Sequence, residues 1–200
     1  GGKSVGGFVG YVQDLKQGAV VSFEDCVNNG NVTGSSYVGG FVGYIYGSIN
    51  ETITISNSIS NGNVTENGDS NNGSVGGFVG SIIFYTNMTV TISSSLNCGN
   101  VIGTGSTGGF LGGTGYMSSS HSMSFNVINS ANKGNISSQQ NFACGFFYVV
   151  GIIDVRIKNS INKGNVIANT DGYRGGYGIT NKITEARNVV SMGDVTGPSG

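Results

Sequence analysis

The chain has 200 residues, of which 37 are glycine, one is proline and only 10% are charged. Its net charge of −1 predicts no basic face for nucleic acid, and no run approaches the roughly 20 apolar residues of a membrane span. Such a composition can indicate low complexity, but the hydrophobic residues, 37% of the chain, recur at fixed positions. We therefore expect a folded array of repeats that does not bind nucleic acid and has no membrane span.

Two motifs recur along the whole chain. The first is Gly-Asn-Val, found in six copies whose first glycines are Gly30, Gly62, Gly99, Gly134 (followed by Asn-Ile), Gly164 and Gly193 (followed by Asp-Val). The second is Gly-Gly-Phe, which begins at Gly6, Gly39, Gly76 and Gly108 and drifts to Cys144-Gly145-Phe146 and Gly175-Gly176-Tyr177. Successive copies of the first motif lie 29 to 37 residues apart, a spacing typical of solenoids. The chain is thus predicted to be one array, with repeats 1–34, 35–73, 74–105, 106–140, 141–172 and 173–200.

Apolar residues form columns when the repeats are aligned on the first glycine of Gly-Asn-Val, which we number zero. Positions −9, −7, −3 and +2 are mostly apolar and β-branched, and they alternate with polar residues, as half-buried strands do. We expect the residues of these columns, such as Ile59 and Val64, to be buried in the central coils. Adding the Gly-Gly-Phe block gives about three short strands per repeat. These features predict an all-β fold, a right-handed parallel β-helix or β-solenoid of about six coils. A sandwich or a propeller is the competing architecture, but a sandwich does not explain a constant column pattern and propeller blades need longer repeats.

Polar columns are equally regular. Position −5 holds Asp25, Asn57, Ser94, Asn129, Asn159 and Asn188; position +1 holds Asn31, Asn63, Asn100, Asn135, Asn165 and Asp194; position −4 is mostly serine. Stacked coils would turn these columns into ladders, in which each amide bonds to the next coil, and Asn also tolerates the left-handed backbone of tight turns. We therefore interpret the asparagines of both columns as structural.

Six asparagines satisfy the N-glycosylation pattern Asn-x-Ser/Thr. Asn31, Asn63 and Asn135 belong to the +1 column, where stacking already explains the residue. Asn50, Asn72 and Asn87 lie in the variable connections between conserved blocks, so they are the better candidates for covalent N-glycans if the source is eukaryotic.

The pairing of Gly-Gly-Phe-Val-Gly with Asn57-Ser58-Ile59-Ser60-Asn61-Gly62-Asn63-Val64 resembles the GLUG motif of repetitive surface proteins, with Phe where Leu is more usual. The resemblance covers most of the chain in six copies, the last one degenerate. It implies an extracellular or cell-surface protein with a structural or adhesive role. It implies no catalytic residue.

Residues that carry catalysis or bind metal ions are sparse. The single histidine, His121, has no second His or Cys nearby to build a triad or a zinc site. Glu24 and Asp25 are adjacent on a predicted strand and should point to opposite faces. Residues 66–71 carry oxygen ligands suited to calcium but lack the EF-hand spacing, and a solvated loop is the more ordinary interpretation. Arg156, Arg174 and Arg187 lack the acidic cluster that a polysaccharide lyase would need. We predict no enzyme, no catalytic or metal site and no cofactor.

Cys26, Cys98 and Cys144 occupy three different positions of the repeat, which excludes a ladder of disulfides and favours buried free thiols.

The sequence favours a structural or adhesive extracellular repeat protein that stacks head to tail into a fibre, or is cut from one. The last repeat closes at Asp194-Val195-Thr196-Gly197, the phase at which another Gly-Gly-Phe would follow, and neither terminal repeat shows a distinct cap. The alternative is a module that binds surface carbohydrates or ice. Tyrosines in the connections favour sugar binding, namely Tyr11, Tyr44, Tyr46, Tyr85 and Tyr116, whereas the regular threonine array that an ice binder needs is missing.

Overall fold

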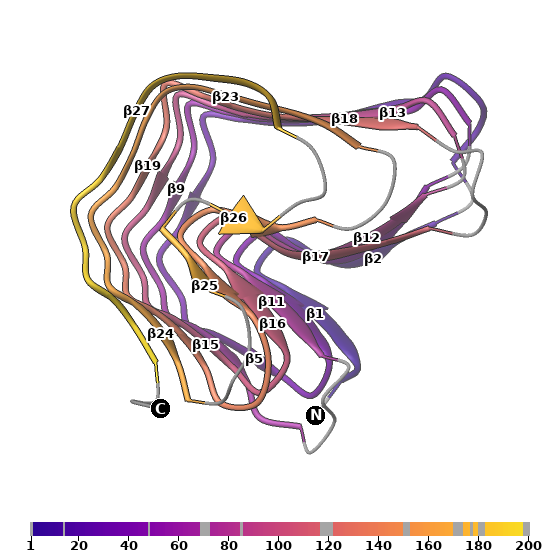
Figure 1. Cartoon of the computed structure of the whole chain (residues 1–200). Helices are drawn as coiled ribbons and strands as arrows, with labels where there is room; N and C mark the ends of the chain where they lie inside the picture. Colours follow the sequence, from indigo (N-terminus) through magenta and orange to yellow (C-terminus); the bar gives the residue numbers. More distant parts are fainter. Residues whose placement is uncertain are drawn as a thin grey trace.

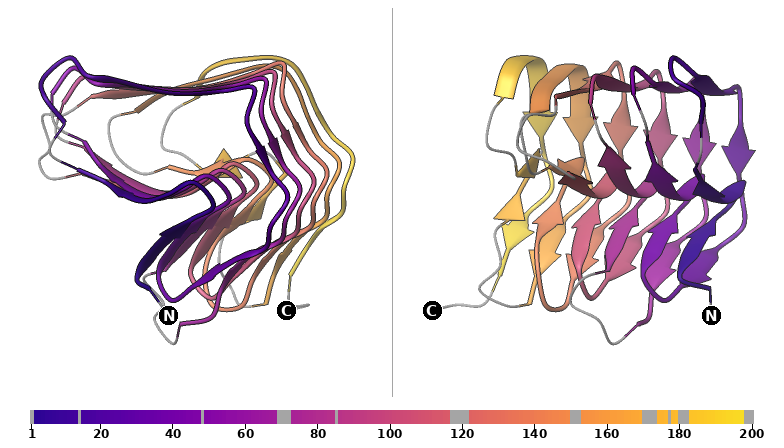
Figure 2. Two further views of the ribbon diagram at one scale, coloured as in Figure 1. Left: turned by 180° about the vertical axis from the view of Figure 1, so that it is seen from behind. Right: turned by 90° about the vertical axis from the view of Figure 1, so that its right-hand side faces the viewer.

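The computed structural model is a parallel β-solenoid of about five turns, in which six successive repeats, called coils below, stack in order, and in the described residues it contains strands but no helix. It describes residues 2–13, 15–47, 49–68, 73–84, 86–116, 122–149, 153–169, 174–176, 178–179 and 183–197. Each coil contributes to four parallel sheets (Figure 1). The coils follow one another along a single axis, with the two termini at opposite ends (Figure 2). The predicted all-β solenoid is confirmed, while its right-handed path stays a prediction.

Two sheets begin each coil. Sheet A consists of β1 (Ser4–Gly6), β6 (Tyr37–Gly39), β11 (Ser74–Gly76), β16 (Ser106–Gly108), β21 (Ala143–Cys144) and β25 (Arg174–Gly175). Sheet B consists of β2 (Val9–Val12), β7 (Val42–Tyr46), β12 (Val79–Phe84), β17 (Leu111–Tyr116), β22 (Phe147–Tyr148) and β26 (Gly178–Ile179). Every pairing between neighbouring coils is parallel and joins equivalent residues of the repeat, such as Val38 with Val75 and Val42 with Val79.

Two further sheets complete the coil. Sheet C has the long strands β3 (Val20–Glu24), β8 (Thr52–Ser56), β13 (Met88–Ser93), β18 (Met123–Ile128), β23 (Ile153–Asn162) and β27 (Ile183–Ser191), with the short strands β4 (Val27–Asn28), β9 (Ile59–Ser60), β14 (Leu96–Asn97) and β19 (Ala131–Asn132) after the first four. Sheet D consists of β5 (Val32–Gly34), β10 (Val64–Glu66), β15 (Val101–Gly103), β20 (Ile136–Ser138), β24 (Val166–Ala168) and β28 (Val195–Thr196).

The fourth sheet arises because the Gly-Gly-Phe block is a corner between two strands and not one strand. In the second coil β6 ends at Gly39, and β7 begins at Val42. A Cβ added to Gly39 would lie 2.0 Å from the carbonyl oxygen of Val42, and one added to Gly40 would lie 2.1 Å from that of Gly77 in the next coil. Only glycine allows these close approaches, so the two glycines let the chain turn sharply and stack at the same point.

The corner divides the cross-section into two lobes (Figure 1). Each lobe has its own hydrophobic cluster. The larger cluster lies between sheets B and C and contains a column of buried phenylalanines: Phe41, Phe78, Phe110 and Phe146. Neighbouring rings of this column have centroids 4.8 to 5.4 Å apart. The smaller cluster lies between sheets A and D and includes Val38, Val64, Val75 and Val101. Columns −9, −7 and +2 supply these interiors, as the sequence predicts.

Column −3 was predicted to be buried, and this is wrong. Ile59, Leu96, Ala131 and Ile161 are only half-buried, and Val27 and Val190 are exposed at 46% and 47%. The residue at −5 has a left-handed backbone, with φ between 48° and 53° in all six coils. This bend interrupts the alternation of the strand, so that positions −4 and −2 face inward and −3 faces outward.

Candidate functional site

The outer asparagine ladder at position +1 is present along the whole array. In each coil from the second to the sixth, the backbone N–H at this position donates to the side-chain oxygen of the preceding coil, at 2.9 to 3.0 Å: Asn63 to Asn31, Asn100 to Asn63, Asn135 to Asn100, Asn165 to Asn135 and Asp194 to Asn165. The ladder joins the last coil to the first through one chain of equivalent contacts. The structural role predicted for this column is what the geometry supports.

The ladder at position −5 is partial. The Nδ2 group of Asn159 donates to Asn129 Oδ1 at 3.0 Å, and that of Asn188 donates to Asn159 Oδ1 at 2.9 Å. Asn57, Asn129, Asn159 and Asn188 all have positive φ, so their first role is to form the bend. Ser94 and Asp25 take the same backbone conformation with side chains that do not extend an amide ladder.

The structure contains an inner asparagine ladder at position −2 that is not among the predictions made from the sequence. Asn97, Asn132 and Asn162 have no exposed surface and lie beside the Gly-Gly corner. Asn97 Nδ2 donates to Asn132 Oδ1, and Asn132 Nδ2 donates to Asn162 Oδ1, both at 2.7 Å. The same Nδ2 groups donate to backbone carbonyls two residues on. This ladder could have been predicted, because position −2 reads Asn, Ser, Asn, Asn, Asn and Ser. The apolar residue at −3 was instead expected to face inward, which would turn position −2 outward.

A serine ladder at position −4 accompanies it. Ser58, Ser95, Ser130 and Ser160 are buried, and each hydroxyl donates to the backbone carbonyl two residues earlier. Each Oγ also accepts a backbone N–H from the preceding coil at 3.2 Å. The regular polar columns therefore connect coils and satisfy backbone groups, which accounts for them without a ligand.

The described glycosylation candidates fall in two structural settings. Asn50 and Asn87 are exposed, with φ of 59° and 54°, and precede long strands of sheet C. Asn31, Asn63 and Asn135 are exposed members of the +1 ladder, where their Oδ1 atoms accept hydrogen bonds. Asn72 lies outside the described residues. The preference for Asn50, Asn72 and Asn87 stays a prediction.

In the acidic loop 66–71, considered above for calcium, the carboxylate of the first residue, Glu66, is occupied by hydrogen bonds to protein groups. Glu66 is 3% exposed, and its Oε1 accepts the N–H of Gly68 at 2.6 Å. Its Oε2 accepts the N–H of Thr104 at 2.8 Å and also the Thr104 hydroxyl, so the carboxylate joins two coils. Asp69 and His121 lie outside the described residues. Within the part that the structure describes, no three His, Cys, Asp or Glu side chains gather as a metal site requires.

The cysteines are free thiols in three environments. Cys144 is buried, Cys26 is half-buried and Cys98 is exposed, so the expectation of a buried thiol is wrong for Cys98. Among the described residues no helix is long and apolar enough to cross a membrane.

Tyrosines gather on the outside of the corner between sheets A and B in the first two coils. The Tyr44 ring lies between Tyr37, at a centroid distance of 4.7 Å, and Tyr11, at 5.2 Å. Burial, followed by the neighbouring tyrosines Tyr37, Tyr11 and Tyr46, raises the pKa of Tyr44 to about 12. Because the rings cover one another, the exposed ring of this cluster is Tyr11, at 46%. Tyr85 and the side chain of Tyr116 lie outside the described residues.

Threonines on the outer face of sheet C form a small group. Thr52 pairs with Thr89 and Thr54 with Thr91 across β8 and β13, but the flanking strands carry Val20, Ser22, Ser124 and Asn126 at these positions. The paired threonines therefore extend over two coils, and serine, asparagine or valine takes their place in the flanking coils.

The two terminal coils expose apolar side chains. Among the described residues, eight of the ten exposed large hydrophobic side chains lie in the first or last coil. Three of them, Phe8 at 46%, Ile183 at 51% and Val195 at 44%, belong to columns that are fully buried in the central coils. The neighbours that bury these columns are the coils above and below, and each terminal coil has one such neighbour.

Charge is separated along the axis. Residues 1–132 contain two basic and six acidic residues, a net charge of −4, whereas residues 133–200 contain seven basic and four acidic residues, a net charge of +3. In the last coils Lys158 Nζ lies 2.8 Å from Glu185 Oε2, and Arg187 Nε lies 2.9 Å from Glu185 Oε1. The hydrogen bond from Lys158, with the charges of Lys158, Arg187 and Arg156, holds the pKa of Glu185 below its usual value.

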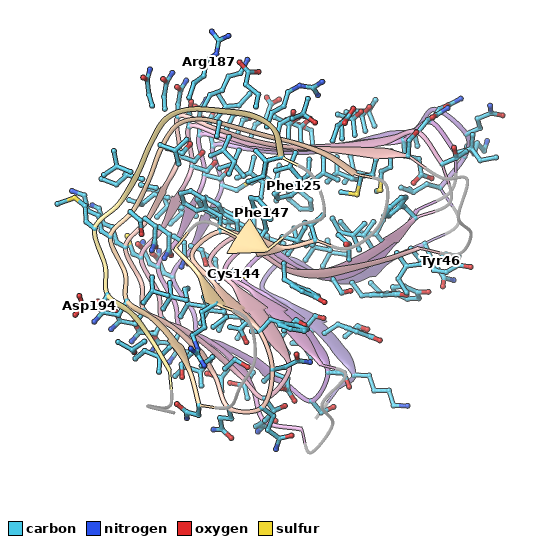
Figure 3. The ribbon with its side chains drawn as sticks, in the orientation of Figure 1. Tyr46, Phe125, Cys144, Phe147, Arg187 and Asp194 are labelled. Carbon is cyan, nitrogen blue, oxygen red and sulfur yellow. The ribbon has the colours of Figure 1, made fainter. Side chains whose placement is uncertain are left out.

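The side-chain view shows where these groups point (Figure 3). Arg187 and Asp194 project outward from the last coil, while Phe125 and Phe147 lie in the larger lobe with ring centroids 5.2 Å apart. Comparisons with protein-family models, with curated proteins and with solved structures found no match.

Proposed function

We propose that this chain is an extracellular or cell-surface structural protein whose solenoid is a building block of a fibre, assembled by end-to-end stacking of coils. The observation that carries the proposal is the exposure of Phe8, Ile183 and Val195 on the terminal coils, in columns that central coils bury. A further coil placed in phase on either end would remove these side chains from water, which is favourable by roughly 25 cal/mol for each Å² of apolar surface buried.

The strand edges of the terminal coils support the same function. In the interior, each strand of the four sheets pairs on both sides, whereas the strands of a terminal coil have a neighbour on one side. An unpaired strand edge is a template for another strand. Because the repeat continues its own pattern, another coil of the same kind fits both the backbone and the side-chain columns.

The extracellular location rests on two sequence features. The repeats resemble the GLUG motif of repetitive surface proteins, and three glycosylation patterns lie in the variable connections. An adhesive role follows from the same resemblance.

Analytical ultracentrifugation and negative-stain electron microscopy of the purified 200-residue chain test the fibre. We expect species that lengthen with concentration while their width stays that of one solenoid. Substituting Phe8 or Val195 by lysine should shorten or disperse them, because either change places a charge on a terminal face. A monomer at all accessible concentrations would overturn the proposal.

Carbohydrate binding is the second candidate, favoured by the tyrosine cluster of Tyr11, Tyr37 and Tyr44. Aromatic faces stack on sugar rings, and Tyr11 presents an exposed face. Glycan-array binding that is lost in Tyr11→Ala and kept in Tyr46→Ala would support a site at this cluster. Equal binding by the wild-type chain and Tyr11→Ala would exclude it.

A further inference from the structure

We infer that the partner of the C-terminal coil is the N-terminal coil of a second copy, and that charge sets this direction, with Arg187 of one copy against Glu24 of the next. This inference rests on the proposed stacking and adds its polarity, its register and the residues that recognise the partner. The site has two halves, the outer surface of the first coil and that of the sixth.

The axial charge separation favours one orientation. In a head-to-tail stack the first repeat (1–34), with two basic and three acidic residues and a net charge of −1, meets the last repeat (173–200), with three basic and two acidic residues and a net charge of +1. Stacking two N-terminal ends, or two C-terminal ends, would place like charges together. Complementary charge steers association and suppresses wrong pairings. A head-to-tail contact is also heterologous, so it propagates without closing.

The column at position −6 supplies a specific pair. Glu24 pairs with Ser56 across β3 and β8, and Lys158 pairs with Arg187 across β23 and β27, so these residues stand in one column of sheet C. A copy stacked in phase continues that column by one strand spacing, about 4.8 Å. The Arg187 side chain is 76% exposed and Glu24 is exposed, so both are free to meet across the junction. The guanidinium keeps donors for a second carboxylate while it bonds Glu185, because it has five N–H groups.

The +1 column supplies a second contact in the same register. Each interior coil donates its backbone N–H at this position to the side-chain oxygen of the coil before it. Asp194 is the last member, and it offers a carboxylate where the earlier coils offer an amide oxygen. The backbone N–H of Asn31 in the next copy would continue the series, with a charge-assisted hydrogen bond in place of a neutral one.

One column limits the strength of the junction. At position −5 the later coil donates through Asn Nδ2, as Asn188 does to Asn159. The first coil has Asp25 at this position, and an ionised carboxylate has no donor for Asn188 of the preceding copy. The junction therefore lacks the rung that joins the fourth, fifth and sixth coils, which favours a reversible contact between copies over the packing of these coils inside one copy.

Charge reversal tests the inference, with association of the 200-residue chain measured by sedimentation velocity. Glu24→Arg and Arg187→Glu should each raise the apparent Kd roughly tenfold or more, and the double variant should return it to near the wild-type value, because the pair is restored in reverse. Lys163→Glu makes the same charge change on an exposed outward position of an interior coil and should leave the Kd nearly unchanged. Raising the salt concentration to about 0.5 M should weaken association of the wild-type chain.

The outcomes separate the two proposals. If the wild-type chain stacks but neither single variant weakens it, or the double variant does not recover, the charge-directed register is wrong and the fibre function stands. If the wild-type chain does not associate at all, both proposals fail. Matching thermal unfolding curves for the variants would show that the substitutions leave the fold intact.

Discussion

At the scale of single residues, the inner asparagine column shows how one amide satisfies two coils. An asparagine Nδ2 group has two hydrogens, and in Asn132 one serves the carbonyl of Gly134 while the other serves Asn162 Oδ1. Ser60 interrupts this column in the second coil. Its Oγ is buried without a hydrogen-bond partner, and so is Asn97 Oδ1, the acceptor that an asparagine at position 60 would reach.

We predict that Ser60→Asn stabilises the protein. The new amide would donate to Asn97 Oδ1 and to the carbonyl of Gly62, as the interior asparagines do, and satisfying a buried acceptor is worth about 1 kcal/mol. Thermal and urea unfolding followed by circular dichroism would measure the change. Ser60→Ala is the matched control, since it removes the unpaired hydroxyl without supplying a donor. If Ser60→Asn is no more stable than Ser60→Ala, the ladder does not explain the column.

Tyr44 gives a prediction for alkaline pH. Its pKa is raised from 10.0 to about 12 by burial and by Tyr37, Tyr11 and Tyr46, so the fold favours the neutral phenol. The stabilisation is fully present below pH 10 and is lost as the pH rises towards about 12, because the unfolded chain ionises first. Between these pH values the melting temperature should fall more steeply with rising pH for the wild-type chain than for Tyr44→Phe. Parallel curves would contradict the burial of this hydroxyl.

At the scale of structural elements, the bend at position −5 sets the shape of the coil. Asn129 has a φ of 50°, between β18 and β19, and its Oδ1 accepts a hydrogen bond from Asn159. A β-branched residue is strained in this conformation, whereas glycine adopts it freely.

Asn129→Val should therefore cost about 1 to 3 kcal/mol of stability through backbone strain, whereas Asn129→Gly should cost less, since it loses the ladder bond alone. Chemical denaturation of the two variants separates conformational strain from hydrogen bonding. Equal losses would mean that the side-chain ladder, and not the backbone conformation, explains asparagine at this position.

The same bend explains what the sequence could and could not predict. The repeat phase and the ladders at +1 follow from the column pattern, because in-register stacking places equivalent residues together. The prediction that Ile59 faces inward is wrong, because alternation assumes a continuous strand. The left-handed backbone at Asn57 reverses which of the following side chains point into the core. Ser60 and Asn97 are the buried neighbours, and a buried polar column is hard to recognise before its hydrogen-bond partners are known.

The Gly-Gly corner and the charged pair at the junction could not be predicted from the sequence, for other reasons. Gly-Gly-Phe was interpreted as one strand, because the steric need for Gly39 and Gly40 appears only when the neighbouring carbonyls are placed. The axial charge separation could have been predicted by counting charges along the array, but the overall net charge of −1 conceals it. The pair of Glu24 and Arg187 required the register of sheet C.

At the scale of the whole molecule, each coil is stabilised mainly by the coils beside it. All four sheets pair successive coils, and both hydrophobic clusters run along the axis. Stability in such an array is close to a sum of repeat terms and nearest-neighbour terms. A defect in a central coil therefore weakens two interfaces, whereas a defect in a terminal coil of the monomer weakens one.

Val64→Asp should unfold several coils together, while Ile59→Asp should be tolerated. Val64 has no exposed surface and lies in the cluster between sheets A and D, where an unpaired carboxylate costs several kcal/mol. Ile59, five residues earlier in the same coil, is half-buried and faces outward, so its carboxylate reaches water and should cost about 1 kcal/mol or less. Circular dichroism melting curves would measure both, and hydrogen exchange would show loss of protection in the coils on either side of Val64. Equal destabilisation by the two substitutions would contradict the outward orientation of column −3, and a loss confined to one coil would contradict the coupling between neighbours.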